Sequence, residues 1–310
     1  MSDLFQPDPL VASLRPLASA VTLSLAEQAY RQYYGFASQD TVQSRLGWFE
    51  AGGYRIAAQV WLPANARATL LLLHGYHDHT ALYRHVIQWA LEMDFAVLAV
   101  DLPGHGLSSG LRSSIQDFAE YQVVLQATLQ QAGDLALPQP WHLCGQSTGG
   151  AILVDYLLNG RPHDAVGETI LLAPLVRPRS WYRARFSYQL LRHFMREVPR
   201  NFSENSHDGE FLEFLRNRDP LQSRTVAAAW VGALNQWVPR IERAPNSTRS
   251  PLIVQGEADM TVDWQHNLAV LQNKFRAPRI LRLPEARHHL ANEVAPLRQC
   301  YFDFLGEHLR

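Results

Sequence analysis

Residues 141–150 read Trp-His-Leu-Cys-Gly-Gln-Ser-Thr-Gly-Gly, which indicates an apolar strand, a tight Gly-x-Ser-x-Gly turn and the start of a helix. Glycine at Gly145 and Gly149 leaves room for neighbouring elements beside a turn that strains the backbone of Ser147. The Ser147 hydroxyl then projects from the C-terminal edge of a sheet, where open α/β folds bind ligands. Because a helix begins at the turn, backbone N–H groups lie where negative charge can develop.

Short apolar runs alternate with helical patterns on both sides of this turn. Several runs lack polar alternation, as expected for strands covered on both faces. The pattern predicts an α/β fold with a mostly parallel sheet flanked by helices. The expected strands are Tyr54–Leu62, Thr69–His74, Ala96–Asp101, Trp141–Gly145, Glu168–Ala173, Pro251–Gln255 and Arg279–Leu283. The expected helices are Tyr83–Met93, Ser114–Gln131, Gly150–Leu158, Trp264–Phe275 and Asn292–Leu309.

Two segments interrupt this alternation. The N-terminal segment precedes the first expected strand, and within it the pattern predicts one helix, Leu17–Tyr34, with Gly35 as its C-cap. The second segment separates two strands by far more than an ordinary connection and is expected to be a folded insertion. The chain is therefore divided into an N-terminal helical extension (1–47), a core (48–175 and 251–310) and an inserted cap (176–250).

The insertion is predicted to be a small helical cap over the sheet. Apolar residues recur there every four positions, in two series. The first series is Tyr182, Phe186, Leu190 and Phe194, and the second is Val226, Trp230 and Leu234. Pro199 and Pro239 follow these series and are expected to end the two helices.

The composition excludes several classes of protein. With 310 residues, 47% of them hydrophobic and 18% charged, the chain can bury a large core and is not disordered. A net charge of −1 gives no reason to expect a nucleic-acid partner. No apolar run approaches the roughly 20 residues of a membrane span, and the N-terminus lacks the basic start of a signal peptide. Two cysteines, Cys144 and Cys300, suit a reducing compartment, so a cytoplasmic location is expected.

A serine hydroxyl is a poor nucleophile near neutral pH, so a base must come from elsewhere in the chain. The expected order along the chain is serine, then an acid, then histidine. The strand Pro251–Gln255 runs into a loop with three candidate acids, Glu257, Asp259 and Asp263, the last of which could instead cap the next helix. The strand Arg279–Leu283 leads to two candidate histidines, His288 and His289.

A third loop can supply donors for a developing oxyanion. The strand Thr69–His74 ends in His74-Gly75-Tyr76, and Gly75 lets the backbone turn close to a substrate. The N–H of Tyr76 could then pair with that of Thr148 to hold the negative oxygen. The neighbouring histidines, His77 and His79, lack the spacing of metal-dependent hydrolases, so we expect no metal here.

Several motifs of the sequence occur together in one superfamily. They are His74-Gly75, Asp101-Leu102-Pro103-Gly104-His105-Gly106, Gly145-Gln146-Ser147-Thr148-Gly149-Gly150, Gly256 with Asp259, and Ala286-Arg287-His288 with Glu293. This set resembles the α/β-hydrolase superfamily, and within it the branch of monoacylglycerol lipases and lysophospholipases. The resemblance covers residues 48–308. The sequence departs from the branch at Gln146, where histidine is frequent, at Thr148, where methionine is frequent, and in its longer N-terminal segment.

The resemblance implies both a fold and a set of site residues. The fold is a mostly parallel eight-stranded sheet flanked by helices, with a helical cap inserted after the sixth strand. The implied site comprises a catalytic triad of Ser147, His288 and Asp259, oxyanion donors at Tyr76 and Thr148, and supporting turns at Gly75, Gly145 and Gly149.

The implied function is hydrolysis of carboxylic esters of lipids through an acyl-enzyme, without a cofactor, by a lysophospholipase or monoacylglycerol lipase. A short-chain carboxylesterase or thioesterase would use the same core. A proline iminopeptidase-like peptidase and a non-catalytic receptor on this fold are further alternatives. The sequence favours neither of these two, because the cap lacks an acidic cluster for a free amine and no candidate triad member is missing.

The start of the cap is strongly basic. From Arg177 to Arg200 there are seven arginines and one acidic residue, Glu197, interleaved with aromatic side chains. Two interpretations are open. The segment is either a solvated basic face over an aromatic contact with the core, or a surface that lies against an anionic membrane or holds a phosphate head group.

Overall fold

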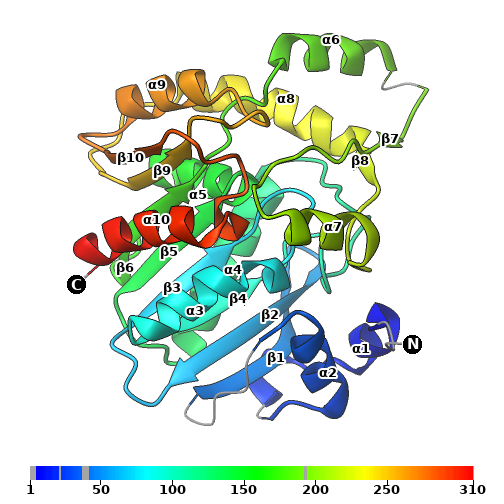
Figure 1. Cartoon of the computed structure of the whole chain (residues 1–310), viewed down its shortest axis with the longest axis vertical. Helices are drawn as coiled ribbons and strands as arrows, with labels where there is room; N and C mark the ends of the chain where they lie inside the picture. Colours follow the sequence, from blue (N-terminus) through cyan, green and yellow to red (C-terminus); the bar gives the residue numbers. More distant parts are fainter. Residues whose placement is uncertain (1–4, 21, 37–41, 192–193, 310) are drawn as a thin grey trace.

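The computed structural model (Figure 1) describes residues 5–20, 22–36, 42–191 and 194–309. Its centre is an eight-stranded sheet in the order β1-β2-β4-β3-β5-β6-β9-β10. The strand β2 pairs antiparallel with β1 and β4, and the remaining neighbours are parallel. The expected α/β fold with a mostly parallel sheet is therefore confirmed. The strands are β1 (Val42–Ala51), β2 (Tyr54–Pro63), β3 (Ala68–Leu73), β4 (Phe95–Val100), β5 (Trp141–Gln146), β6 (Val166–Leu172), β9 (Leu252–Gly256) and β10 (Arg279–Leu283).

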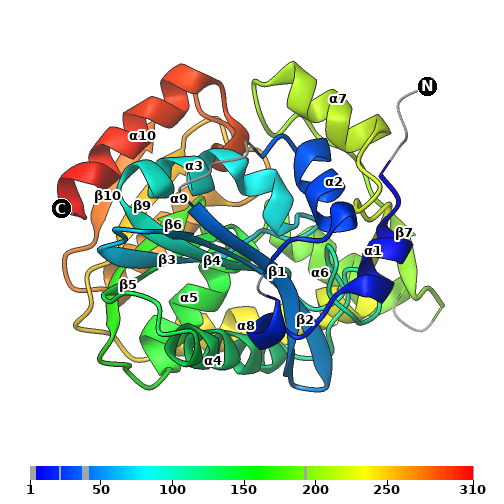
Figure 2. The same ribbon diagram turned by 90° about the horizontal axis from the view of Figure 1, so that it is seen from below.

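Helices cover both faces of the sheet, which is why β3, β4 and β5 are buried along their whole length. Figure 2 shows α3 and α10 on one face and α4 and α5 on the other. These helices are α3 (Arg84–Glu92), α4 (Ala119–Asp134), α5 (Thr148–Asn159) and α10 (Ala295–His308), and α9 (Trp264–Lys274) connects β9 to β10. Because β3, β5, β6, β9 and β10 are parallel, the loops after their C-terminal ends meet at one edge.

The first strand of the sheet lies partly inside the segment that we expected to precede the core. The strand β1 begins at Val42 and pairs with β2 along its full length, so the expected boundary at residue 48 is wrong. Its first half is only partly buried, which weakens the hydrophobic pattern of an edge strand. The pair Gly52-Gly53, both with positive φ, marks the hairpin turn and was the available sequence signal.

The N-terminal extension docks on the core, but not as one long helix. In place of Leu17–Tyr34 the structure has a short 3-10 helix, η1 (Leu17–Ser19), and a separate helix, α2 (Leu25–Tyr33), preceded by α1 (Pro7–Ser13). Ser24 begins α2 because its side chain accepts from the Glu27 amide while the Glu27 carboxylate accepts from the Ser24 amide. The expected end at Gly35 is correct, since Gly35 has φ +75° directly after the C-cap.

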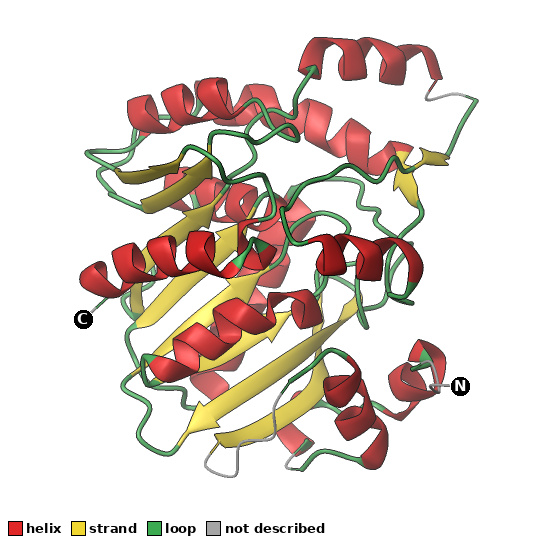
Figure 3. Ribbon diagram, viewed as in Figure 1, coloured by secondary structure: helices red, strands yellow, loops and turns green. Residues whose placement is uncertain are grey.

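The cap lies between β6 and β9, as the resemblance implied. It contains α6 (Trp181–Leu191), β7 (Glu197–Pro199), α7 (Gly209–Asn217), β8 (Thr225–Ala227) and α8 (Ala228–Arg243). Figure 3 shows β7 and β8 as two short strands among the cap helices; they pair antiparallel. Pro199 lies in β7, whereas Pro239 lies inside α8, so the expected helix end at Pro239 is wrong. Proline removes one backbone hydrogen bond, and α8 continues because Trp237, Val238 and Ile241 are buried.

The helix α6 carries an apolar stripe that faces solvent. Figure 1 shows α6 at the outer edge of the cap, beside α8. Its stripe residues Tyr182, Phe186 and Leu190, continued by Phe194, are 57–85% exposed, although Trp181 is buried. The interpretation as an aromatic contact with the core is therefore correct for Trp181 and wrong for Tyr182, Phe186 and Phe194. One of the seven arginines between Arg177 and Arg200, Arg192, lies outside the described residues.

Candidate active site

The candidate nucleophile lies on the turn between β5 and α5. Ser147 has φ +52° and ψ −109°, a left-handed conformation that is strained for any residue except glycine. The two flanking glycines are required by space: a Cβ atom on Gly149 would lie 2.2 Å from the Leu73 carbonyl oxygen, and one on Gly145 would lie 2.4 Å from Gly149. The sharp turn therefore depends on the Gly-x-Ser-x-Gly pattern.

Three loops bring the expected serine, histidine and acid together at the C-terminal edge of the sheet. The Ser147 hydroxyl donates to His288 Nε2 at 3.0 Å, and His288 Nδ1–H donates to Asp259 Oδ2 at 2.7 Å. Asp259 Oδ1 accepts from the amides of Thr261 and Val262, which holds the carboxylate in the loop after β9. All three side chains are buried.

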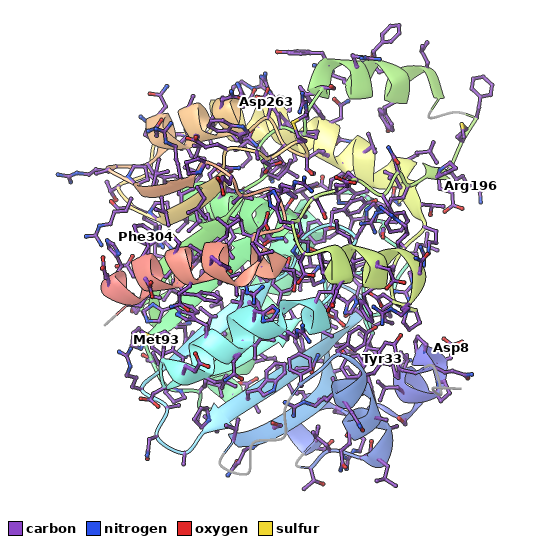
Figure 4. The ribbon with its side chains drawn as sticks, in the orientation of Figure 1. Asp8, Tyr33, Met93, Arg196, Asp263 and Phe304 are labelled. Carbon is purple, nitrogen blue, oxygen red and sulfur yellow. The ribbon has the colours of Figure 1, made fainter. Side chains whose placement is uncertain are left out.

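The other candidates from the sequence lie elsewhere. Glu257 forms an ion pair with Arg282 at 3.3 Å, and Asp263 caps α9 by accepting from the His266 amide. Figure 4 labels Asp263 beside α9. His289 Nε2 lies 3.3 Å from Asp78 Oδ2, and it is His288 that contacts Ser147.

Burial and charge act in opposite directions on the His288–Asp259 pair. Burial is the largest effect on His288 and disfavours its imidazolium, but the charge and hydrogen bond of Asp259 outweigh it and raise the His288 pKa. Burial likewise disfavours the Asp259 carboxylate, but His288 and the backbone amides outweigh it and lower the Asp259 pKa. The pair therefore favours a charged imidazolium beside a carboxylate.

The candidate oxyanion loop follows β3. Gly75 approaches the nucleophile so closely that a Cβ atom there would lie 3.4 Å from the Cβ of Ser147. His74 holds this loop, because Nδ1–H donates to the Gly75 carbonyl and Nε2 accepts from the Leu102 amide. Thr148 is the first residue of α5, where amides lack an intrahelical acceptor. Tyr76 and Thr148 line the same pocket as Ser147, and their amides stay the predicted oxyanion donors.

The remaining histidines of this loop have protein partners. His77 contacts the Thr225 carbonyl at 3.1 Å, and His79 donates to Asp219 at 2.9 Å. Within the described parts of the chain, no group of three or more His, Cys, Asp or Glu side chains is arranged to hold a metal ion. His79 instead connects the loop to the cap.

A pocket of about 280 Å³ contains Ser147, Thr148, Tyr76 and His288. Its apolar lining includes Leu175, Val226 and Trp230, and the Trp230 ring stacks on Tyr76 at 3.8 Å. Its polar lining includes Arg200, Ser203 and Asn205 from the cap. The pocket thus has polar and apolar parts, and the cap supplies residues to both.

Two site residues were not assigned a role from the sequence. Gln146 accepts from the Ala291 amide at 2.9 Å and so joins the nucleophile turn to the histidine loop. Arg200 was only one of seven arginines, and its place in the pocket depends on the pairing of β7 with β8. No local sequence signal distinguishes Arg200 from the others.

A strained serine on a strand–turn–helix, with the histidine and the acid on loops after later strands, is the arrangement of an α/β hydrolase. The chain is therefore a protein of this class. Comparison with protein families places it further: residues 64–295 match the Hydrolase_4 family, described as serine aminopeptidase, S33, and the chain belongs to this family.

Known proteins similar to this chain include lipases. The chain is 29% identical to the monoglyceride lipase of Rattus norvegicus over 260 residues, covering 79% of this chain and 83% of that protein. It is 27% identical to a phospholipase of Bacillus subtilis over 101 residues, covering 33% and 38%. A soluble variant of the monoglyceride lipase of Saccharomyces cerevisiae matches the fold with a TM-score of 0.74 at 18% identity, covering 89% and 97%.

These comparisons confirm the expected membership of the α/β-hydrolase superfamily and the likeness to monoacylglycerol lipases. They support an ester hydrolase that acts on lipids. Within the described residues, no helix is both long and apolar enough to cross a bilayer.

Proposed function

We propose that the chain is a serine hydrolase that cleaves carboxylic esters of single-chain lipids, monoacylglycerol or lysophospholipid, through an acyl-enzyme on Ser147. The observation that carries this proposal is the continuous hydrogen-bonded series from Ser147 Oγ through His288 to Asp259, at the wall of a half-polar pocket. Relatives named as monoglyceride lipase and phospholipase support the same class of substrate.

The first half of the proposed reaction forms the acyl-enzyme. His288 Nε2 takes the proton of the Ser147 hydroxyl while the serine oxygen attacks the ester carbonyl carbon. Asp259 keeps the proton of His288 on Nδ1 and stabilises the imidazolium. The amides of Tyr76 and Thr148 hold the oxyanion of the tetrahedral intermediate. His288 then gives its proton to the leaving alcohol as the bond from carbon to that oxygen breaks.

The second half regenerates the enzyme. A water molecule gives a proton to His288 Nε2 and attacks the acyl carbon, and the second tetrahedral intermediate is held by the same two amides. When it collapses, the proton returns from His288 to Ser147 Oγ and the fatty acid is released. No step requires a cofactor.

Replacement of the nucleophile tests this proposal. We expect Ser147→Ala to lower kcat on a p-nitrophenyl ester and on 1-octanoylglycerol by about 10⁴-fold or more, while circular dichroism stays unchanged. A fluorophosphonate should label the wild-type protein on Ser147 and leave Ser147→Ala unlabelled. The matched control is Ser44→Ala, on the distant strand β1, which should keep full activity. Full activity of Ser147→Ala would contradict the proposal.

The family description raises a second candidate, an aminopeptidase. Such an enzyme needs carboxylates in the pocket to bind the free amine of its substrate. The pocket contains one acid, Asp78, which already accepts from the Tyr83 hydroxyl and lies beside His289, and it also contains the cation Arg200. This charge pattern favours an ester with a neutral or anionic polar group. An aminoacyl arylamide in the same assay should therefore be a poor substrate.

We further propose that α6 places the enzyme on anionic membranes, where its substrates reside. The apolar stripe of Tyr182, Phe186 and Leu190 is exposed, and it is accompanied by exposed arginines. An apolar face flanked by cations suits the boundary between head groups and acyl chains. The exposed arginines of this surface are Arg179, Arg183, Arg185 and Arg196, and Figure 4 labels Arg196 at the outer edge of the cap.

Charge neutralisation tests the membrane proposal. We expect replacement of Arg179, Arg183, Arg185 and Arg196 by glutamine to weaken binding to phosphatidylglycerol vesicles, by about 1 kcal/mol per arginine near the surface. Activity on a monomeric p-nitrophenyl ester should not change. Four exposed arginines elsewhere serve as the matched control: Arg161, Arg216, Arg276 and Arg279. Unchanged vesicle binding in the cap variant would exclude this role of α6.

A further inference from the structure

The guanidinium of Arg200 lines the same pocket as Ser147 and His288. The cap holds it from one side, because Nη1 donates to Gln222 Oε1 at 2.6 Å and its plane lies over the Phe202 ring at 4.5 Å. The backbone amide of Arg200 donates to the Arg224 carbonyl, which continues the pairing of β7 with β8. The side chain is therefore fixed before any ligand arrives.

The other edge of this guanidinium is available for a ligand. Among the residues that the structure describes, none accepts a hydrogen bond from Nε or Nη2, and no carboxylate lies within ion-pair distance of Arg200. These two N–H groups point in parallel, in the geometry that binds two oxygens of a phosphate or carboxylate. A partly buried cation with such an edge is suited to an anionic ligand.

The environment of Arg200 also favours an anionic ligand. Burial is the largest effect on Arg200 and lowers its pKa, so a bound anion would replace lost solvation. The acid of the pocket, Asp78, has its own donors in Tyr83 and His289. In the cap, Asp219 is occupied by His79 and Tyr34. Asp78 and Asp219 therefore act on Arg200 only through their charges, which raise its pKa against burial, and neither is its hydrogen-bond partner.

We infer that Arg200 binds the phosphate of a lysophospholipid head group, on the alcohol side of the ester that Ser147 attacks. This inference rests on the proposed function and specifies its substrate. An alkyl chain would leave the guanidinium unpaired, so the acyl chain belongs with Leu175, Val226 and Trp230. Ser203 and Asn205 lie in the same polar lining and suit the glycerol hydroxyl.

The test compares two substrates that differ only in the phosphate group. They are 1-octanoyl-lysophosphatidic acid and 1-octanoylglycerol, both used below their micelle concentrations so that binding of α6 to a lipid surface plays no part. We expect Arg200→Gln to lower kcat/KM for the anionic substrate about ten- to a hundredfold, mainly through KM, and that for the neutral one less than twofold. For the anionic substrate, Arg200→Lys should have a kcat/KM between those of the wild type and Arg200→Gln, since lysine keeps the charge but lacks the two parallel N–H donors.

A matched control comes from the other arginine on the same ring. Arg224 also lies over Phe202, at 5.1 Å, but it is exposed and does not line the pocket. Arg224→Gln should leave both substrates unaffected. An equal loss of kcat/KM on both substrates in Arg200→Gln would assign Arg200 a structural role. No loss on either substrate would exclude contact between Arg200 and the head group. Each of these results overturns the inference.

Binding without turnover separates this inference from the proposed function. In calorimetry, Ser147→Ala should bind the anionic lipid at least tenfold more tightly than Ser147→Ala/Arg200→Gln does, with equal binding of the neutral lipid. If Arg200 recognises a free phosphate ion as well, inorganic phosphate should compete with the anionic lipid for Ser147→Ala and not for Ser147→Ala/Arg200→Gln. A wild-type protein that hydrolyses neither lipid would refute the proposed function, while the binding difference alone would still decide the role of Arg200.

Discussion

Ser147 combines a reactive position with an unfavourable backbone conformation. Its φ of +52° costs roughly 1–3 kcal/mol for a residue with a side chain. Backbone hydrogen bonds hold it there: its amide donates to the Leu172 carbonyl at 2.9 Å, and its carbonyl accepts from Ala151 and Leu175. The surrounding sheet thus maintains a strained residue at the site of the proposed chemistry.

This strain predicts a variant that is more stable but inactive. Glycine adopts positive φ without steric cost. The free energy of unfolding of Ser147→Gly should therefore be about 1 kcal/mol higher than that of Ser147→Ala, while both variants lack esterase activity. Urea denaturation of the two variants measures the difference. Equal or lower stability of Ser147→Gly would show that the turn is not strained.

The three acids of the loop after β9 should respond differently to substitution. Asp259→Asn should lower kcat by about 10³- to 10⁴-fold, because the amide no longer holds the His288 proton on Nδ1. Glu257→Gln, which removes only the ion pair with Arg282, is the matched control and should keep near-normal activity. Esterase assays of both variants check the assignment, and a loss confined to Glu257→Gln would reverse it.

The charge of Asp259 also predicts the pH dependence. His288 acts as a base only when neutral, and Asp259 raises its pKa above the ordinary value of 6.5. Activity should therefore fall as the pH decreases through a pKa above 6.5. In Asp259→Asn the largest raising effect is lost and burial is opposed only by the smaller effect of the Asp78 charge, so the residual activity should fall only at lower pH. Profiles of kcat/KM against pH for the wild type and Asp259→Asn measure the two apparent pKa values. Coincident profiles would contradict an effect of Asp259 on the pKa of His288.

At the scale of elements, a buried hydrogen-bond cluster joins three parts of the chain. His79 follows β3, Asp219 lies in the cap after α7, and Tyr34 ends α2. His79 donates to Asp219 Oδ2 at 2.9 Å and the Tyr34 hydroxyl donates to Oδ1 at 2.7 Å; the side chains of His79 and Asp219 have no solvent exposure. This cluster fixes the cap relative to the oxyanion loop.

The cluster predicts a cost for breaking the pair. Asp219→Asn should lower the free energy of unfolding by about 3 kcal/mol, because it leaves His79 buried without its counter-charge. Glu213→Gln, in the same part of the cap, removes an exposed ion pair with Arg218 and should cost less than about 1 kcal/mol. Urea denaturation compares the two variants; similar costs would mean that the buried pair does not anchor the cap.

The same pair predicts how stability changes with pH. Burial opposes the charge on His79, but Asp219 outweighs it and raises the His79 pKa, so its contribution is present below pH 6.5 and lost as the pH rises through the raised value. The Asp219 pKa is lowered from 3.8, so its contribution is present above that value and lost in stronger acid. The free energy of unfolding of the wild type, measured by urea denaturation, should decline from pH 5 to pH 9. The decline should be smaller in Asp219→Asn.

Most elements of the core could be predicted because their signals are local. Apolar runs located β2 to β6, β9 and β10, and the glycines around Ser147 located the turn. The strand β1 was missed because its exposed half lacks a clear pattern, and the helix Leu17–Tyr34 was wrong because the capping box at Ser24 was not used. The choice of Asp259 and His288 over their neighbours came from the family resemblance, since local spacing did not distinguish them.

At the scale of the whole molecule, the properties that sequence could not predict are those created by folding. The apolar series on α6 has the same period as a core helix, and only the packing of the cap leaves it exposed. Arg200 reaches the pocket through β7, and the N-terminal extension completes the core rather than forming a separate unit. Tyr33 on α2, labelled in Figure 4, donates to the Arg218 carbonyl of the cap.

The docking of the N-terminal extension predicts that its loss affects both stability and the cap. Leu10, Leu17, Tyr30 and Tyr34 are buried against the core, and each such side chain contributes roughly 1.5–3 kcal/mol. Deletion of residues 1–36 should therefore lower the free energy of unfolding by at least about 5 kcal/mol and reduce esterase activity, since Asp219 loses the Tyr34 hydroxyl. Leu25→Ala, at an exposed position of α2, is the control and should change neither. A truncated protein with unchanged denaturation midpoint and activity would show that the extension is dispensable, because folding of the core and placement of the cap would then not depend on it.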